Sequence, residues 1–249
     1  MSPAKLLDFK GEDINGATTA PIFSEMTAQL VDVCQDLSVE DISTIMKVNN
    51  DIANTAYGWF QSFNSETVPT RAASLAYNGI AYKGLNAHDF DSSDIEYAQK
   101  RLNIVSGLWG MLRPFDGIKP YRLEMVRKIQ PEGYKNLYDF WKVALNQHLS
   151  ERLATDEKVI INLASKEYSK VLTKSLLPKD TKVIDIVFLQ QQGDEFKQIV
   201  VHSKKARGLM SRFIIKNKLS LSEEVKAFDY EDYLFYPPLS EENKWVFVR

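Results

Sequence analysis

The chain has 249 residues, of which 44% are hydrophobic and 26% charged, and these values are ordinary for a folded globular protein. Its formal net charge of −2 gives no bulk attraction for nucleic acid, so such a role has to come from local clustering of charge. A single cysteine, Cys34, excludes an internal disulfide and a cysteine-rich zinc site, and no apolar run approaches the roughly twenty residues that span a membrane.

The ionisable side chains give little support for a metal site. The three histidines, His88, His148 and His202, are far apart in the sequence, and the acidic run from Asp89 to Glu96 is typical of a solvated helix start. We therefore predict neither a metal nor another cofactor. No basic region followed by an apolar core is visible near residue 1, so we expect a cytoplasmic protein with no membrane partner.

Helical periodicity marks much of the first 154 residues. Apolar residues three and four apart predict helices over 24–37 and 136–154. Ser38 has the pattern of an N-cap and predicts a helix whose apolar face continues to Ile52. We interpret residues 72–82 as a short strand, a turn and a second extended piece.

The remainder of the chain is richer in strand patterns. Short apolar runs predict strands at 158–163, 183–189, 196–202, 233–236 and 245–248. We therefore expect a mixed α/β fold, with helices packed around a mixed sheet in one domain over residues 1–249.

A basic segment is the most informative local feature. Between Phe196 and Ser222 the chain has seven Lys or Arg and no Asp or Glu. The predicted helix over 203–219 places cations along one side, at positions Lys204, Lys205, Arg207 and Arg212. The glycine among them, Gly208, costs roughly 1 kcal/mol relative to Ala in a helix, which favours close approach of a backbone or ligand. The segment is either a solvated helix face or a site for an anion.

Two further segments could carry chemistry. The turn at Gly107–Gly110 is either structural or exposes backbone amides to a phosphate. At the end of the strand over 158–163, Asn162, Glu167 and Tyr168 could line a pocket and do acid–base work, or they could belong to an ordinary helix start.

These segments together resemble the YaaA family of peroxide stress response proteins. The resemblance rests on pieces that occur in the family's order over nearly the whole chain: Ser2–Lys5, Ser106–Pro114, Pro120–Met125, Leu137–Trp141, Ile161–Ser165 with Glu167 and Tyr168, and Lys204–Phe213.

The resemblance implies a cytoplasmic protein that limits iron-dependent damage under hydrogen peroxide stress. It also implies an unusual DNA-binding α/β fold with a helix-hairpin-helix element and a positively charged cleft. On this sequence, the resemblance places the hairpin of that element at Gly107–Gly110 with Arg113. The cleft residues implied by the resemblance are Lys5, Arg122, Lys204, Lys205, Arg207 and Arg212.

One departure from the family pattern concerns the N-terminus. Members begin with a short apolar strand before the Ser-Pro-Ala-Lys motif, whereas Met1 directly precedes Ser2 here. We therefore expect either that the natural chain starts upstream of Met1 or that this protein lacks the first strand of the family.

Three hypotheses follow. We favour DNA binding through phosphate contacts, without sequence preference and without catalysis. The alternative is an enzyme for a small anionic nucleotide or nucleoside derivative, with Asn162, Glu167 and Tyr168 as catalytic candidates. Direct iron sequestration is the least favoured, because the sequence lacks clustered iron ligands.

Overall fold

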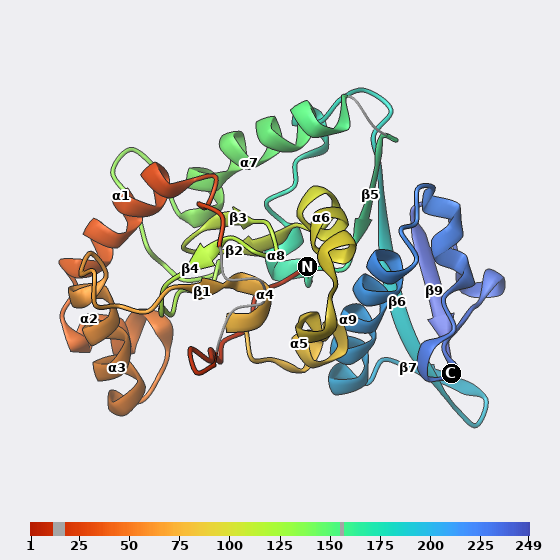
Figure 1. Cartoon of the computed structure of the whole chain (residues 1–249), viewed down its shortest axis with the longest axis horizontal. Coiled ribbons are helices and arrows are strands. Elements are labelled where there is room, and N and C mark those ends of the chain that lie inside the picture. Colours follow the sequence, from red (N-terminus) through yellow and green to blue (C-terminus); the bar gives the residue numbers. More distant parts are fainter. Residues whose placement is uncertain (12–17, 155–156) are drawn as a thin grey trace.

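The computed structural model describes residues 1–11, 18–154 and 157–249 (Figure 1). Three helices, α1 (Ser24–Gln35), α2 (Val39–Met46) and α3 (Asn50–Ser62), lie at one end of the molecule, and the largest sheet lies at the other. The N-terminus lies between these two parts, near α8, and the C-terminus lies beside the sheet (Figure 1).

Short helices and two small antiparallel sheets fill the space next to the first three helices. The sheets pair β1 (Arg71–Ala72) with β4 (Gly117–Ile118), and β2 (Ile104–Ser106) with β3 (Gly110–Leu112). The helices are α4 (Ala73–Ala76), α5 (Ile80–Leu85), η1 (Ala87–Asp89), α6 (Ser92–Arg101), α7 (Leu137–Leu153) and α8 (Lys166–Ser169).

The main sheet is mixed, as predicted. Its order is β5-β6-β9-β8, and β7 pairs with the far end of β6. The central strand β6 runs parallel to β5 and β9, whereas β7 and β8 are antiparallel to their neighbours. The strands are β5 (Val159–Asn162), β6 (Lys182–Gln192), β7 (Glu195–Lys197), β8 (Leu234–Phe235) and β9 (Lys244–Val248). Connecting 3-10 helices are η2 (Lys174–Leu176), η3 (Ser222–Ala227), η4 (Tyr230–Asp232) and η5 (Pro237–Leu239).

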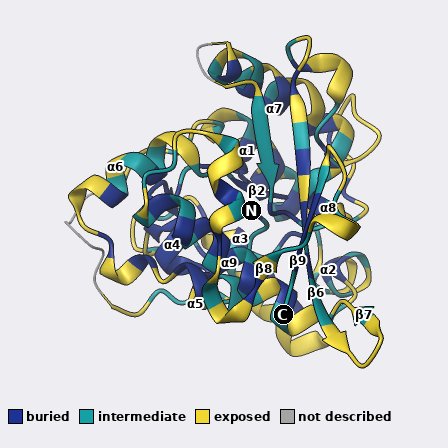
Figure 2. Cartoon of the chain, turned by 90° about the vertical axis from the view of Figure 1, so that its right-hand side faces the viewer, coloured by how far each residue is buried: buried dark blue, intermediate teal, exposed yellow. Residues whose placement is uncertain are grey.

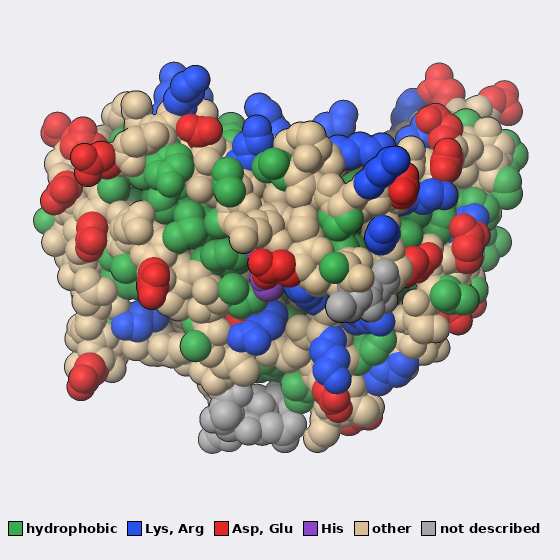
Figure 3. All heavy atoms as spheres, turned by 90° about the horizontal axis from the view of Figure 1, so that it is seen from above, with side chains coloured by type: hydrophobic (Ala, Val, Ile, Leu, Met, Phe, Trp, Pro, Cys, Tyr) green, Lys and Arg blue, Asp and Glu red, His purple; other side chains and the backbone are tan. Residues whose placement is uncertain are grey.

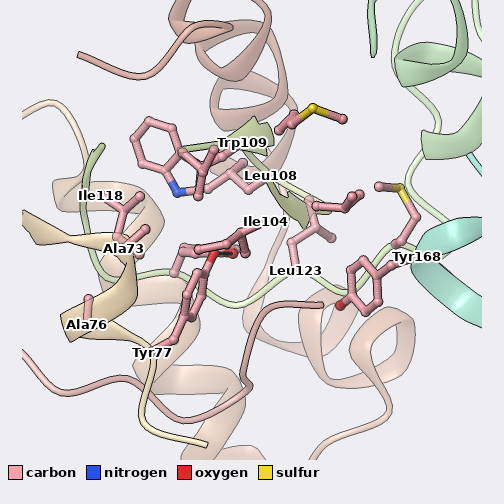
Figure 4. Close-up of a cluster of buried hydrophobic side chains, with 14 of the residues drawn as sticks. Ala73, Ala76, Tyr77, Ile104, Leu108, Trp109, Ile118, Leu123 and Tyr168 are labelled. Atoms are coloured by element: carbon pink, nitrogen blue, oxygen red, sulfur yellow. Dashed lines mark hydrogen bonds between the residues drawn. The ribbon is translucent and has the colours of Figure 1, made fainter. Parts of the chain in front are cut away.

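Buried side chains form two clusters, one for each part of the molecule. Figure 2 marks along the ribbon which residues are buried. The larger cluster surrounds β2 and β3, where Tyr77, Trp109 and Tyr168 approach from different elements (Figure 4). The smaller cluster lies between the main sheet and α9 (Val200–Lys216), which buries Ala206 and Met210. Ala81 and Leu102 pack against both clusters and thereby connect the two parts.

Helices α5 and α9 approach each other very closely. A Cβ added to Gly208 would lie 1.8 Å from the Ala81 carbonyl oxygen, and one added to Gly84 would lie 2.5 Å from the Lys205 carbonyl oxygen. No side chain fits at either position. The backbone approach that Gly208 predicted is therefore confirmed, and it fixes the position of the basic helix.

Several predicted elements differ from the structure. The helix that Ser38 caps ends at Met46, because Lys47 is left-handed with φ 54°, and α3 begins after it. The interpretation of 72–82 as extended chain is wrong, since α4 and α5 occupy most of it. The strand predicted over 196–202 ends at Lys197, where the chain turns into α9.

The glycine turn at 107–110 is a β-hairpin. It joins the antiparallel strands β2 and β3 instead of two helices, so the placement of a helix-hairpin-helix element at this segment is wrong. The reason is local packing. A Cβ at Gly107 would lie 2.4 Å from the Leu123 carbonyl oxygen, whereas Gly110 has φ +68° and lies against the Trp141 ring. Both glycines are required by the core of the protein.

Candidate functional site

A buried carboxylate shared by three cations lies at the centre of the polar region. Glu124 is 5% exposed, and Arg127 donates hydrogen bonds to it at 2.9 and 3.0 Å. Lys5 Nζ and an Arg122 nitrogen lie 3.1 and 3.4 Å from Oε1. Burial opposes ionisation of Glu124, but hydrogen bonds from Arg127 and Lys5 outweigh it and lower its pKa. Three cations against one carboxylate leave a local excess of positive charge.

Arg122 also retains unused hydrogen-bonding capacity. Its side chain is 16% exposed, and its buried Nε–H has no acceptor within the described chain. Buried donors without acceptors are uncommon in proteins and often mark the place of an absent water or ion.

Two of the three catalytic candidates lie next to this cluster. Glu167 accepts a hydrogen bond from the Val126 amide at 3.3 Å and attracts Arg127. Tyr168 is buried and points into the hydrophobic cluster (Figure 4). Burial raises the pKa of Tyr168, and the negative charge of Glu167 raises it further. The phenol therefore stays protonated at neutral pH and can act as a donor there.

The N-terminal segment connects this cluster to α5 and to the start of α8. The Tyr82 hydroxyl donates to the Ser2 carbonyl oxygen at 3.0 Å, and the Ser165 amide donates to the Ser2 hydroxyl at 2.8 Å. Ser2 is thus bound to α5 on one side and to the start of α8 on the other. Three residues later, Lys5 reaches Glu124.

A second polar cluster lies where β5 ends. The third candidate, Asn162, is opposite Asp185 in the parallel register, and its Nδ2 donates to Asp185 Oδ1 at 2.6 Å. Asn162 Oδ1 accepts from the Ala164 amide at 3.0 Å. Arg207 of α9 is half-buried and attracted electrostatically by Asp185. Burial lowers the pKa of Arg207, and Asp185 partly opposes that shift.

The basic residues of α9 differ in how far they are neutralised. Lys205 forms an ion pair with Glu231, and Arg212 binds Asp89 in bidentate fashion at 2.7 and 2.6 Å. Lys204 is exposed and forms no ion pair within residues 1–11, 18–154 and 157–249. Lys204 and Arg207 are therefore the cations of this helix with capacity left for an external anion.

The residues predicted around the glycine turn have internal partners. The Arg113 side chain binds Asp116 at 2.9 Å and the Ala20 carbonyl oxygen at 2.8 Å. Inside the turn, the amides of Leu108 and Trp109 donate to the buried Ser106 hydroxyl. These amides do not point toward solvent.

The structure thus brings Lys5 and Arg122 together around Glu124, and Asn162 and Arg207 around Asp185. Arg113 and Arg212 lie in separate ion pairs. Sequence reasoning missed residues whose role depends on partners far along the chain: Ser2, Tyr82, Glu124 and Asp185. It also missed Arg127, although the partner of Arg127 is only three residues away. For Asp185, the signal available was its place in a predicted strand next to the one that ends at Asn162.

The distribution of charge over the surface is uneven. On the face shown in Figure 3, Lys and Arg side chains concentrate over the middle, and Asp and Glu lie mostly toward the two ends. Within the described parts of the chain, no three His, Cys, Asp or Glu side chains are grouped as metal ligands. No helix in those parts is long and apolar enough to cross a bilayer.

Comparison with known proteins decides the family. A family model described as peroxide stress protein YaaA matches residues 1–239. This chain belongs to the YaaA family. A UPF0246 protein of Clostridium perfringens strain 13 is 41% identical over the full chain and 98% of its own length. UPF0246 proteins of Clostridium perfringens strains ATCC 13124 and SM101 are each 40% identical with the same coverage. The resemblance that the motifs gave to the YaaA family is confirmed.

Proposed function

We propose that this YaaA-family protein binds DNA through its phosphate backbone and thereby helps limit iron-dependent damage during peroxide stress. The observation that carries the proposal is the set of cations left without full neutralisation: Lys5, Arg122, Lys204 and Arg207. Binding of this kind depends on charge and is largely independent of sequence.

The contacts around Ser2 support a common location for these cations. Ser2 is held by Tyr82 of α5, and α5 packs directly on α9 through Gly208. The same segment carries Lys5 to Glu124 and Arg122. Lys5 is 60% exposed although it is ion-paired, so it remains accessible to a phosphate.

Protection from iron follows from the same contacts in this proposal. Ferrous iron associates with phosphate oxygens, and a protein held on those oxygens by Lys and Arg competes for them. The protection is thus indirect and requires no iron ligand in the protein.

We place the helix-hairpin-helix-like element of the family at α2 and α3. These helices are consecutive and are joined by a short turn at 47–49, in which Lys47 is exposed. Their first turns carry Glu40, Asp41 and Asp51, so any contact with DNA at this element depends on the turn and on Lys47. Lys47→Glu is then expected to weaken DNA binding.

Fluorescence anisotropy with a labelled duplex tests the proposal. At about 50 mM salt we expect binding, and at about 200 mM a large loss of affinity, on the order of tenfold or more for a few phosphate contacts. Two duplexes of unrelated sequence should give similar affinities. No binding to duplex or branched DNA at low salt would contradict the proposal.

A second candidate function is an enzyme for a small anionic nucleotide or nucleoside derivative. The observation that favours it is the grouping of Asn162 and Asp185 at the carboxyl end of β5, where α/β proteins commonly bind ligands. In this candidate, Glu167 and Tyr168 supply a carboxylate and a protonated phenol. Stabilisation of the protein against heat by nucleotides would support it.

A further inference from the structure

We propose that Asn162, Asp185 and Arg207 form a binding site for the sugar and phosphate of a ribonucleotide. In this site the Arg207 guanidinium holds the phosphate, and the Asp185 carboxylate accepts hydrogen bonds from the sugar hydroxyls. The inference deepens the second candidate function and does not depend on DNA binding.

The first step of the argument is the unused capacity of Arg207. The residue is half-buried, yet its guanidinium forms no hydrogen bond or ion pair within the part of the chain that the structure describes. A guanidinium has five N–H donors, and groups of this kind are normally partnered when they are taken out of water. Donors left over beside a strand end indicate a ligand with acceptor oxygens.

The second step is that the backbone that carries Arg207 is fixed by packing. Its carbonyl oxygen accepts from the Ser211 hydroxyl at 3.0 Å, and the next residue, Gly208, lies against Ala81 with no room for a Cβ. The helix that presents the guanidinium therefore cannot shift toward an internal partner. A preorganised donor loses less entropy when a ligand binds.

The third step concerns Asp185, which is exposed. Its Oδ1 accepts from Asn162 Nδ2 at 2.6 Å, and its Oδ2 accepts no hydrogen bond from any residue in the described ranges. Asn162 is itself fixed by the Ala164 amide. The pair therefore presents an oriented carboxylate oxygen with free lone pairs at the carboxyl end of β5, beside the first half of β6.

These groups together select the class of ligand. Asp185 and Arg207 attract each other without forming an ion pair, so both can contact an outside molecule. The carboxylate repels a phosphate but accepts hydrogen bonds from hydroxyls. The guanidinium has no acceptor atoms, and its N–H groups donate to phosphate oxygens. Lys204, exposed one turn before Arg207, adds positive charge on the phosphate side. A sugar phosphate carries both required groups in one small molecule.

Isothermal titration calorimetry with adenosine monophosphate, 2′,3′-dideoxyadenosine monophosphate and inorganic phosphate tests the inference. We expect adenosine monophosphate to bind. The affinity of the dideoxy compound should be lower by about tenfold or more, because it lacks the hydroxyls that donate hydrogen bonds to Asp185. Equal affinities for the two nucleotides, or no binding of adenosine monophosphate, would overturn the inference. These titrations contain no DNA, so their failure is separate from a failure of DNA binding.

Two variants and a control assign the contacts. Asp185→Ala should reduce the preference for the ribonucleotide over its dideoxy analogue to near unity, whereas Arg207→Gln should weaken both about tenfold or more. Lys174→Gln, an exposed lysine on η2, removes one positive charge elsewhere and should leave both affinities unchanged. A preference retained in Asp185→Ala, or unchanged binding in Arg207→Gln, would contradict the assigned roles. Thermal melts check folding of each variant.

Discussion

Glu124 is the residue on which the polar region depends most. It is nearly inaccessible and holds its sequence neighbours Arg122 and Arg127 together with Lys5, which comes from the start of the chain. Solvent screens the attraction between Lys5 and Glu124, because the Lys5 side chain is 60% exposed. The Arg127 side chain is 13% exposed and is therefore the stronger partner of Glu124. Glu124 is therefore both a structural anchor and the counter-ion that positions the cations.

We predict that Glu124→Ala lowers the free energy of unfolding by about 3–5 kcal/mol, because two largely buried guanidinium groups lose the carboxylate that they share. Urea denaturation measures the change. Glu66→Ala, which alters an exposed glutamate, is the matched control and should stay within about 0.5 kcal/mol of the parent protein. A loss below about 1 kcal/mol for Glu124→Ala would show that the cluster contributes little to folding.

Cys34 bears on the connection between the family and peroxide. It is fully buried in α1, and burial raises the pKa of its thiol to about 12. Because the thiolate is the form that peroxide oxidises, we predict no modification of Cys34 in the native protein and rapid modification after unfolding. Mass spectrometry before and after denaturation measures this. Oxidation at equal rates in both states would contradict the burial argument.

At the scale of elements, the contact between α5 and α9 determines where the basic helix lies. We predict that Gly208→Ala destabilises the protein by about 1–3 kcal/mol, since the added methyl group would overlap the Ala81 carbonyl oxygen. Gly58→Ala in α3 is a matched control: a Cβ there meets no atom within 4 Å, and the change should stabilise by about 0.5–1 kcal/mol. Thermal denaturation compares the two; equal effects would mean that the helices can separate at little cost.

The ion pairs between α6 and α9 make stability depend on pH. Asp94 is 3% exposed; burial raises its pKa, but hydrogen bonds from Lys216 and Lys218 outweigh burial and lower it overall. Arg212 similarly lowers the pKa of Asp89. A carboxylate with a depressed pKa stabilises the folded state above its unfolded pKa of about 3.9, and this contribution is lost as pH falls through the folded value.

We therefore predict that the free energy of unfolding falls as pH decreases below about 5, and that Asp94→Asn makes this dependence shallower. Denaturation curves at several pH values measure it. Asp194→Asn, in the exposed turn between β6 and β7, should keep the slope of the parent protein. An unchanged slope in Asp94→Asn would exclude this carboxylate as a source of the pH dependence.

At the scale of the whole molecule, sequence patterns identified the amphipathic elements and missed the fully buried ones. The helices over 136–154 and 203–219 were predicted because one face of each is apolar, and the mixed α/β class followed from them and the strands. Residues 71–77 are all buried, so α4 shows no periodicity that would distinguish it from a strand.

The candidate site shows the same division. The strand end at Asn162 was recognisable from local sequence, but its partner Asp185 is defined by the register between β5 and β6. Likewise, Arg122 and Arg127 flank Glu124 in the sequence, but Lys5, the third cation of the cluster, reaches it from the start of the chain. Long-range pairing is thus the part of the site that local patterns do not contain.

The salt dependence of DNA affinity tests the central claim, that cations from distant segments act together on phosphate. The logarithm of affinity should fall linearly with the logarithm of salt concentration, with a slope of about −0.9 for each phosphate neutralised. In a variant with Lys5→Gln, Lys204→Gln and Arg207→Gln, we predict a slope shallower by about 2–3. An identical slope in the parent protein and this variant would contradict the claim.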